Sequence, residues 1–240
     1  MSVSVYQQVL GDDFYKLTPQ LQRYFGMPYA GSHGRGTGTY EVAGSELHWL
    51  RPILRLFGSR NILFAERERD VPFTVLNRPD GDILRATRLF HFGEVSSSPG
   101  SGDRLSSAAA RRQASRRAKM TTRTMVDEMR VIDGVLHDYL GTNKELEVTF
   151  DIAVSEDKLT MTSSGSWLRL SLGKRLFRFK LPTVLGARVV LTERWELDHQ
   201  RVSVTLTNPI LGEIFTYRGT FTYDWVRDEV IHSRNSETGR

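Results

Sequence analysis

The stretch FTYRGTFTYDW at residues 215–225 decides the fold class. Along it, aromatic side chains alternate with polar ones at a period of two, which is the pattern of a β-strand with one buried and one solvated face. Such a strand requires a sheet whose other strands also present an apolar face. The aromatic positions of the predicted inner face are Phe215, Tyr217, Phe221, Tyr223 and Trp225.

The same alternation recurs from residue 71 onward. Residues 71–76 and 83–90 predict a first hairpin, and Asp133-Gly134 predicts another, because both central residues of a type I′ turn adopt positive φ angles. About ten strands in short-turn succession predict an antiparallel meander, and a sheet of that length curls or closes around its apolar face. Further alternating runs occupy residues 146–154, 159–161, 168–172, 177–181, 189–197 and 202–206.

The first 60 residues predict helices with one strand between them. Thr18 followed by Pro19 is typical of a helix N-terminus, and Pro52 is expected to kink a later helix or delay its start. Residues 27–38 are predicted as a loop that leads into a short strand at Tyr40. The predicted fold is therefore α+β and mostly β, with about ten antiparallel strands in a strongly curved sheet or barrel, packed with short N-terminal helices.

Length and composition indicate one domain. The chain has 240 residues, which is enough for a single large core, and we predict one β-rich domain over residues 1–225. Residues 96–122 are rich in Ser, Ala and Arg and nearly free of large apolar side chains, so we expect a low-complexity insertion there. Residues 226–240 are predicted to form a polar, disordered tail.

The formal net charge of +5 comes from one segment. Residues 96–123 hold seven basic side chains and one acidic one, which leaves 26 basic and 27 acidic residues elsewhere. Because this segment has no aromatic side chain on which a base would stack, we do not expect a nucleic-acid partner. The sequence shows no apolar run of roughly 18 residues and no signal-peptide pattern, so we expect no transmembrane segment and a cytoplasmic location.

Motifs for metals and cofactors are weak. The chain has no cysteine, which excludes disulfide scaffolds, thiolate zinc sites and cysteine nucleophiles. The six histidines lack metal-ligand spacing, and His137 and Asp138 are expected on opposite faces of one strand. The run Gly34-x-Gly36-x-Gly38 lacks the preceding strand and following helix of a phosphate loop, so we interpret it as a flexible loop. We expect no metal site and no cofactor.

The candidate binding residues lie on two predicted strands. Alternation places Glu193 on the same face as Leu191 and Trp195, and a carboxylate on an apolar face requires a partner or a raised pKa. Both a structural ion pair and a catalytic acid are compatible with this pattern. Barrels of about eight strands are wide enough either to be filled by side chains alone or to hold one small ligand. The aromatic face of residues 215–225 therefore either fills the core or lines a cavity. The ligand-binding candidates are Glu193, Trp195, Tyr217, Phe215 and Phe221.

Several separated segments form a recognisable set: VYQQVLGDDFYKLTPQLQRYFG, GTGTYEV, LRPILRLFG, GVLHDYLG, FRFKLP, LTERWELD and NPILGEIFTYRGTF. Together they resemble a bacterial family known as domain of unknown function 4166. In GVLHDYLG, Asp138 occupies the acidic position of the family pattern, whereas Leu140 replaces its aromatic residue. The resemblance implies a β-rich domain that is sometimes fused behind oxidoreductase-like or membrane segments, and it implies no known activity.

Three functions are open at this point. The leading hypothesis is a non-catalytic domain that binds a small hydrophobic or amphipathic ligand inside the curved sheet. The second is an enzyme that uses Glu193, with Tyr217 or Asp138, on an apolar substrate. The third is a protein-interaction module that docks on an oxidoreductase or a membrane partner, which an exposed apolar patch would favour.

Overall fold

The computed structural model describes residues 3–93, 120–155, 158–173, 175–182 and 186–228 of the chain. Most of the predicted insertion at residues 96–122 and most of the predicted tail at residues 226–240 lie outside these ranges. The last described strand continues to Arg227, so the first two residues of the predicted tail belong to the sheet instead.

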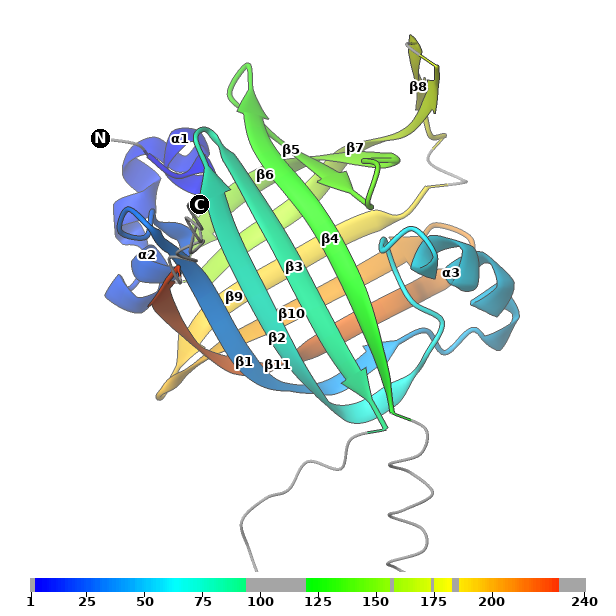
Figure 1. Cartoon of the computed structure of the whole chain (residues 1–240), viewed down its shortest axis with the longest axis horizontal. Helices are drawn as coiled ribbons and strands as arrows, with labels where there is room; N and C mark the ends of the chain where they lie inside the picture. The colour runs from blue at the N-terminus through cyan, green and yellow to red at the C-terminus, as the bar shows by residue number, and fades with distance from the viewer. Residues whose placement is uncertain (1–2, 94–119, 156–157, 174, 183–185, 229–240) are drawn as a thin grey trace, which may run out of the picture.

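Eleven antiparallel strands in the described residues form one sheet, and ten of them close into a barrel (Figure 1). The bounds are β1 Ser32–Gly44, β2 Glu68–Asp80, β3 Ile83–Phe92, β4 Thr121–Ile132, β5 Val135–Leu140, β6 Leu146–Ser155, β7 Lys158–Leu172, β8 Arg175–Lys180, β9 Arg188–Glu196, β10 His199–Asn208 and β11 Gly212–Arg227. Around the barrel the order is β6, β5, β4, β3, β2, β1, β11, β10, β9 and β7, and β7 pairs back with β6. The predicted mostly-β antiparallel barrel is confirmed.

One strand closes the barrel and one stands outside it. The first residues of β7 pair with β9 on one side and with β6 on the other. β7 stays paired with β6 as far as Leu168, and its last residues, from Trp167 to Leu172, pair with β8, which projects at the upper right of Figure 1. The register of β6 and β7 shifts between Thr149 and Phe150, so β7 contains a bulge that changes which of its side chains face inward.

Short helices cover the two ends of the barrel (Figure 1). At one end lie α1 Val5–Leu10, a 3₁₀ turn at Gly11–Lys16 and α2 Pro19–Phe25. The Thr18 hydroxyl accepts a hydrogen bond from the Leu21 amide and caps α2 as predicted. At the other end, a 3₁₀ turn at His48–Leu50 leads into α3 Arg51–Gly58, where Pro52 lies in the first turn and the α-helix starts late. Among the described residues, no helix combines the length and the apolar character needed to cross a bilayer.

The core continues from the barrel into the N-terminal helices. Leu21 and Phe25 of α2 and Phe14 of the preceding turn are buried against β5, β6 and β7. Full burial of an aliphatic or aromatic side chain contributes about 1.5–3 kcal/mol. The Tyr6 ring of α1 packs edge-on against Phe25, with 4.6 Å between centroids, and its hydroxyl donates to Met129 Sδ at 3.4 Å. The helices therefore seal this end of the barrel.

The predicted loop at residues 27–38 is wrong, because β1 begins at Ser32. The run Gly34-x-Gly36-x-Gly38 lies inside this strand, between β2 and β11, and not in a flexible loop. A Cβ atom at Gly34 would overlap the Tyr223 ring, and one at Gly38 would overlap the Thr220 carbonyl. These glycines are therefore explained by the close approach of β11.

Candidate functional site

The inner face of the barrel is apolar except for a small set of polar side chains. Arg88 on β3, Asp127 on β4 and Asp138 on β5 line one cavity of about 90 Å³. Three neighbouring strands thus bring these groups to a single place. The rest of the lining is mainly aliphatic and methionine, and includes Met125, Met129, Met161, Leu191 and Val204.

Arg88 and Asp127 form a buried ion pair. The Arg88 guanidinium donates a hydrogen bond to Asp127 Oδ1, and the two side chains are 15% and 2% exposed. Removing two such charges from water costs several kcal/mol for each ion, on the order of what good geometry recovers. The second oxygen, Asp127 Oδ2, is buried and accepts no hydrogen bond from any residue that the structure describes. The pair is therefore held in place but incompletely satisfied.

Asp138 is the second buried carboxyl of the cavity. Burial raises its pKa well above its ordinary value, the neighbouring Asp127 carboxylate raises it further, and Arg88 opposes the shift. The shift favours the protonated form of Asp138, which can donate a hydrogen bond. Its Oδ1 atom has no hydrogen-bond partner among the described residues. As expected from strand alternation, His137 points the other way and its Nδ1 lies 2.9 Å from Glu147 Oε1 on the outer face.

Glu193 is buried on β9 but does not line the cavity. The Gln200 side chain of β10 donates a hydrogen bond to Glu193 Oε2. Burial raises the pKa of Glu193 to about 8, while hydrogen bonds from Gln200 and Tyr24 and the charge of Arg88 lower it. The contacts that the structure describes include no ion pair of Glu193: its direct partners are an amide and a phenol.

The other four candidate residues separate into different environments. Tyr217 lines the cavity, and burial raises the pKa of its phenol to about 12. Phe215 packs against Phe64 at 4.9 Å between centroids, so it belongs to the filled core. Phe221 is likewise buried, with the Tyr24 ring 5.5 Å away. Trp195 is half-buried and donates from Nε1 to the Leu197 carbonyl at 3.1 Å, outside the cavity lining.

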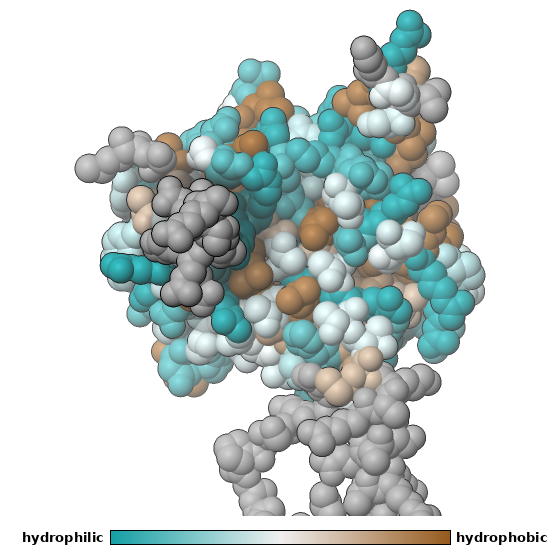
Figure 2. Space-filling model, viewed as in Figure 1, coloured by the Kyte–Doolittle hydropathy of each residue, from teal (hydrophilic) through white to brown (hydrophobic). Residues whose placement is uncertain are grey.

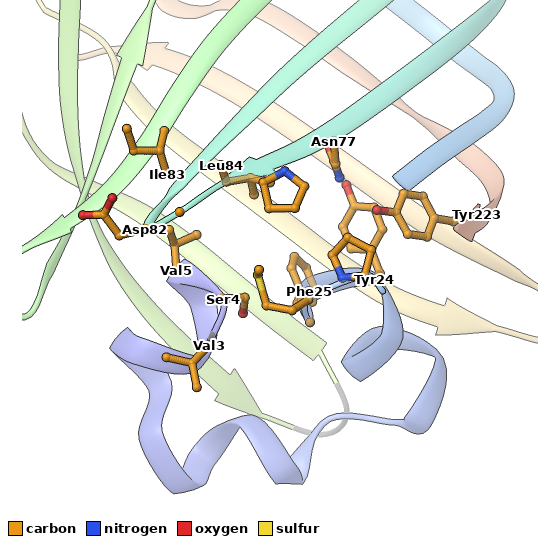
Figure 3. A pocket seen from close by; sticks show the side chains of 15 residues that line it. Val3, Ser4, Val5, Tyr24, Phe25, Asn77, Asp82, Ile83, Leu84 and Tyr223 are labelled. Atoms are coloured by element: carbon orange, nitrogen blue, oxygen red, sulfur yellow. The ribbon is translucent and has the colours of Figure 1, made fainter. Parts of the chain in front are cut away.

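A second, smaller pocket lies where the N-terminal helices meet the barrel, with a volume of about 20 Å³. Figure 3 shows Tyr24, Asn77 and Tyr223 on one side of it and Val3 and Ser4 on the other. The Tyr24 and Tyr223 rings are in edge contact, with 4.6 Å between centroids. This volume accommodates about one water molecule, so it is not a ligand pocket of useful size.

The strand pattern alone did not single out Arg88 and Asp127. Residues 83–90 were predicted as a strand, and Arg88 shares an inward face with Ala86 and Phe90, which are both buried. Alternation with these apolar residues was therefore the sequence signal that could have predicted a buried position for Arg88. Within the described ranges, no group of three or more His, Asp or Glu side chains has a metal-binding arrangement.

Comparisons with known proteins identify a family and name no activity. The chain is 28% identical over 230 residues to the uncharacterized protein YndH of Bacillus subtilis (strain 168), an alignment that covers 91% of this chain and 96% of that protein. No solved structure matches the chain. The family model described as "Domain of unknown function (DUF4166)" matches residues 17–99 and 100–221. The chain therefore belongs to the DUF4166 family.

Proposed function

We propose that the barrel binds a small amphipathic molecule in the cavity beside Arg88, Asp127 and Asp138. The observation that carries this proposal is the pair of buried oxygens, Asp127 Oδ2 and Asp138 Oδ1, without a hydrogen-bond partner among the described residues of a largely apolar cavity. Each unsatisfied buried group costs about 1–3 kcal/mol. A ligand with a hydrogen-bonding group would remove that cost while its apolar part contacts the methionine and aliphatic lining.

The charges of the cavity favour a neutral ligand. Arg88 and Asp127 compensate each other, and the raised pKa of Asp138 favours its uncharged form. A free ionised group would therefore enter the barrel without a counter-charge, which is costly. A hydroxyl donates to Asp127 and accepts from Asp138, so an alcohol is the chemical class that fits both atoms.

The volume limits the size of the ligand. A cavity of about 90 Å³ is smaller than the roughly 300–1,000 Å³ of pockets for drug-sized molecules. A short aliphatic alcohol is therefore the expected class. Met125, Met129 and Met161 in the lining are unbranched and flexible, so the cavity adapts to chains of somewhat different length.

The test combines native mass spectrometry with a titration. Native and denatured masses of the purified protein are compared first, and an added mass that is lost on unfolding identifies a retained ligand. Straight-chain alcohols of increasing length and the matching alkanes are then titrated while the melting temperature is followed. We expect stabilisation by alcohols and a much weaker effect of alkanes, because alkanes leave both carboxyl oxygens unpaired.

Two aspartate variants localise the effect. Asp138→Leu removes one of the polar anchors and is expected to abolish the difference between alcohols and alkanes. Asp151→Leu, at an exposed position of β6, is the matched control and should respond like the parent chain. Equal responses of the parent and Asp138→Leu to alcohols would show that this cavity is not the binding site.

The enzyme hypothesis is supported by a different residue. A carboxyl group whose pKa is raised to about 8 by burial is suited to hold or transfer a proton near neutral pH. Glu193, however, is outside the cavity lining, so a substrate in that cavity would not reach it directly. The test is to measure the pKa of Glu193 by NMR. A value near the ordinary glutamate pKa would remove the basis of this second candidate.

A further inference from the structure

The outer half of β7 and the whole of β8 form a hairpin that projects from the barrel (Figure 1). β7 pairs with β9 only from Lys158 to Thr162, whereas its pairing with β8 continues to Leu172. A surface groove of about 570 Å³ lies at the root of this hairpin and includes Ser163 and Arg188. The hairpin therefore stands at the mouth of the barrel, beside the start of β9.

One face of the hairpin is apolar and exposed. Leu168 lies opposite Phe179, and Leu170 lies opposite Phe177, so these four side chains share a face. Leu170, Phe177 and Phe179 are 48%, 40% and 53% exposed, and the two phenylalanine rings are 6.4 Å apart. The bulge in β7 makes this face continuous with the inner face of the barrel, since Leu168 lies opposite Leu146. Each ring therefore leaves a large part of its surface open to solvent.

The opposite face of the hairpin carries basic side chains and one exposed leucine, Leu176. Arg169 and Arg178 lie opposite each other there, and Lys180 follows on the same face. The Arg178 guanidinium donates two hydrogen bonds to Glu147 at 2.8 and 2.9 Å and lies 4.0 Å from the Trp167 ring centroid. These contacts fix the orientation of the hairpin against the barrel.

The charge of this part of the chain has one sign. From residue 167 to residue 180, the part of the chain that forms the hairpin, the sequence contains five Lys or Arg residues and no Asp or Glu. Glu147 of β6 pairs with two of them, Arg169 and Arg178. Figure 2 shows hydrophilic and hydrophobic residues side by side on the projecting hairpin. A projecting element with exposed aromatic and leucine side chains among basic groups is the composition that favours an anionic membrane surface.

Other exposed apolar side chains lie at the same end of the barrel. The turn between β10 and β11 exposes Ile210, and Thr207 of β10 pairs with Arg188 at the start of β9. Trp49, before α3, and Leu56 of α3 are exposed as well, and α3 follows the end of β1, next to the start of β11. The apolar surface thus extends beyond the hairpin at this end of the molecule.

We infer that the β7–β8 hairpin docks the protein on an anionic lipid bilayer, with Phe177 and Phe179 inserted at the headgroup level and Arg175, on the same face of β8, at a lipid phosphate. The charge complementarity selects this occupant over an uncharged surface, because residues 167–180 contain five basic side chains and no acidic one. The hairpin lies outside the cavity that we assign to a ligand, so the inference does not depend on the proposed function.

The experiment is vesicle flotation of the full chain. Vesicles of phosphatidylcholine alone are compared with vesicles of an equimolar mixture of phosphatidylcholine and phosphatidylglycerol. We expect flotation with the anionic vesicles, a loss of flotation in high salt, and little binding to phosphatidylcholine. Asp138→Leu is expected to float like the parent chain, which separates this test from that of ligand binding.

Three double variants test the hairpin. Phe177→Ser with Phe179→Ser should lower binding at least about tenfold because the inserted apolar area is lost. Arg175→Gln with Lys180→Gln should lower it by about fivefold for each charge removed. The matched control, Ile132→Ser with Leu197→Ser, removes two exposed apolar side chains from turns at the other end of the barrel and should bind like the parent. Urea midpoints verify that each variant remains folded.

The contrary outcomes are equally distinct. Absence of flotation with anionic vesicles overturns the inference, and so does flotation that the phenylalanine variant retains in full. A third outcome is that the parent chain does not bind vesicles but forms dimers in analytical ultracentrifugation, and that the phenylalanine variant is monomeric. The hairpin would then be a self-association surface, and the membrane assignment would be wrong.

Discussion

Glu193 should make the free energy of unfolding decrease as the pH rises from about 4.5 to about 8, and Glu193→Gln should remove this decrease. The carboxyl is fully buried beside Gln200, and burial raises its pKa to about 8 from an ordinary value of 4.5. In the unfolded chain the same group ionises in water. The two states therefore bind different numbers of protons between these two pH values.

The sign and the size follow from that difference. Below pH 4.5 the carboxyl is protonated in both states and has no effect on stability. Between pH 4.5 and 8 the folded protein keeps a proton that the unfolded chain has lost, so stability falls by about 1.4 kcal/mol for each pH unit. At pH 7 the accumulated loss is about 3 kcal/mol, a substantial fraction of the roughly 5–15 kcal/mol that stabilise a typical domain.

The assay is urea unfolding of the parent and Glu193→Gln at several values between pH 5 and pH 8. Glutamine has nearly the same shape and forms a hydrogen bond with the Gln200 amide, so the variant is expected to fold. Asp138 shifts in the same direction, and the difference between the two proteins isolates Glu193. Glu213→Gln, at an exposed position of β11, is the control and should follow the parent. Parallel stability curves of parent and Glu193→Gln across this range would refute the reasoning.

Two further predictions concern the barrel wall and its interior. Arg88→Met should destabilise the protein by about 3–5 kcal/mol because it leaves Asp127 buried without a counter-charge, and the double variant Arg88→Met with Asp127→Leu should recover most of this loss in urea unfolding. A double variant as unstable as the single one would contradict this account of the pair. Gly38→Ala should lower stability by at least about 2 kcal/mol, since its Cβ would overlap the Thr220 carbonyl of the paired strand. Gly81→Ala, at a turn position with φ of 63° and no atom within 4 Å, should cost only about 1 kcal/mol, and equal melting temperatures of the two variants would refute the packing argument.

Most strands were predictable because the alternation of apolar and polar residues is visible in the sequence of each strand alone. The pattern at residues 215–225 depends only on neighbouring residues, and β11 has the predicted apolar face. β1 was missed over its first half because glycine is a poor strand former and its cover comes from β11, far away in the sequence. Residues 159–161 and 168–172 were read as separate runs because the bulge in β7 interrupts the period of two between them.

The site was less predictable than the barrel, since its residues become neighbours only when the barrel forms. Alternation placed Glu193 inward correctly, but the sequence cannot show that Gln200 and Tyr24 are its partners. Arg88 and Asp127 belong to strands separated by residues 93–120, so no local pattern connects them.

The buried charges need an explanation other than stability. Replacing a buried ion pair by apolar residues of similar volume is often neutral or stabilising, by about 1–4 kcal/mol. Arg88, Asp127 and Asp138 thus occupy positions where aliphatic side chains would serve packing equally well or better. They also converge on one cavity, and two of their oxygens remain without a partner among the described residues. Packing explains neither the convergence nor the unpaired atoms, whereas the ligand that we propose would complete the hydrogen bonds and account for both.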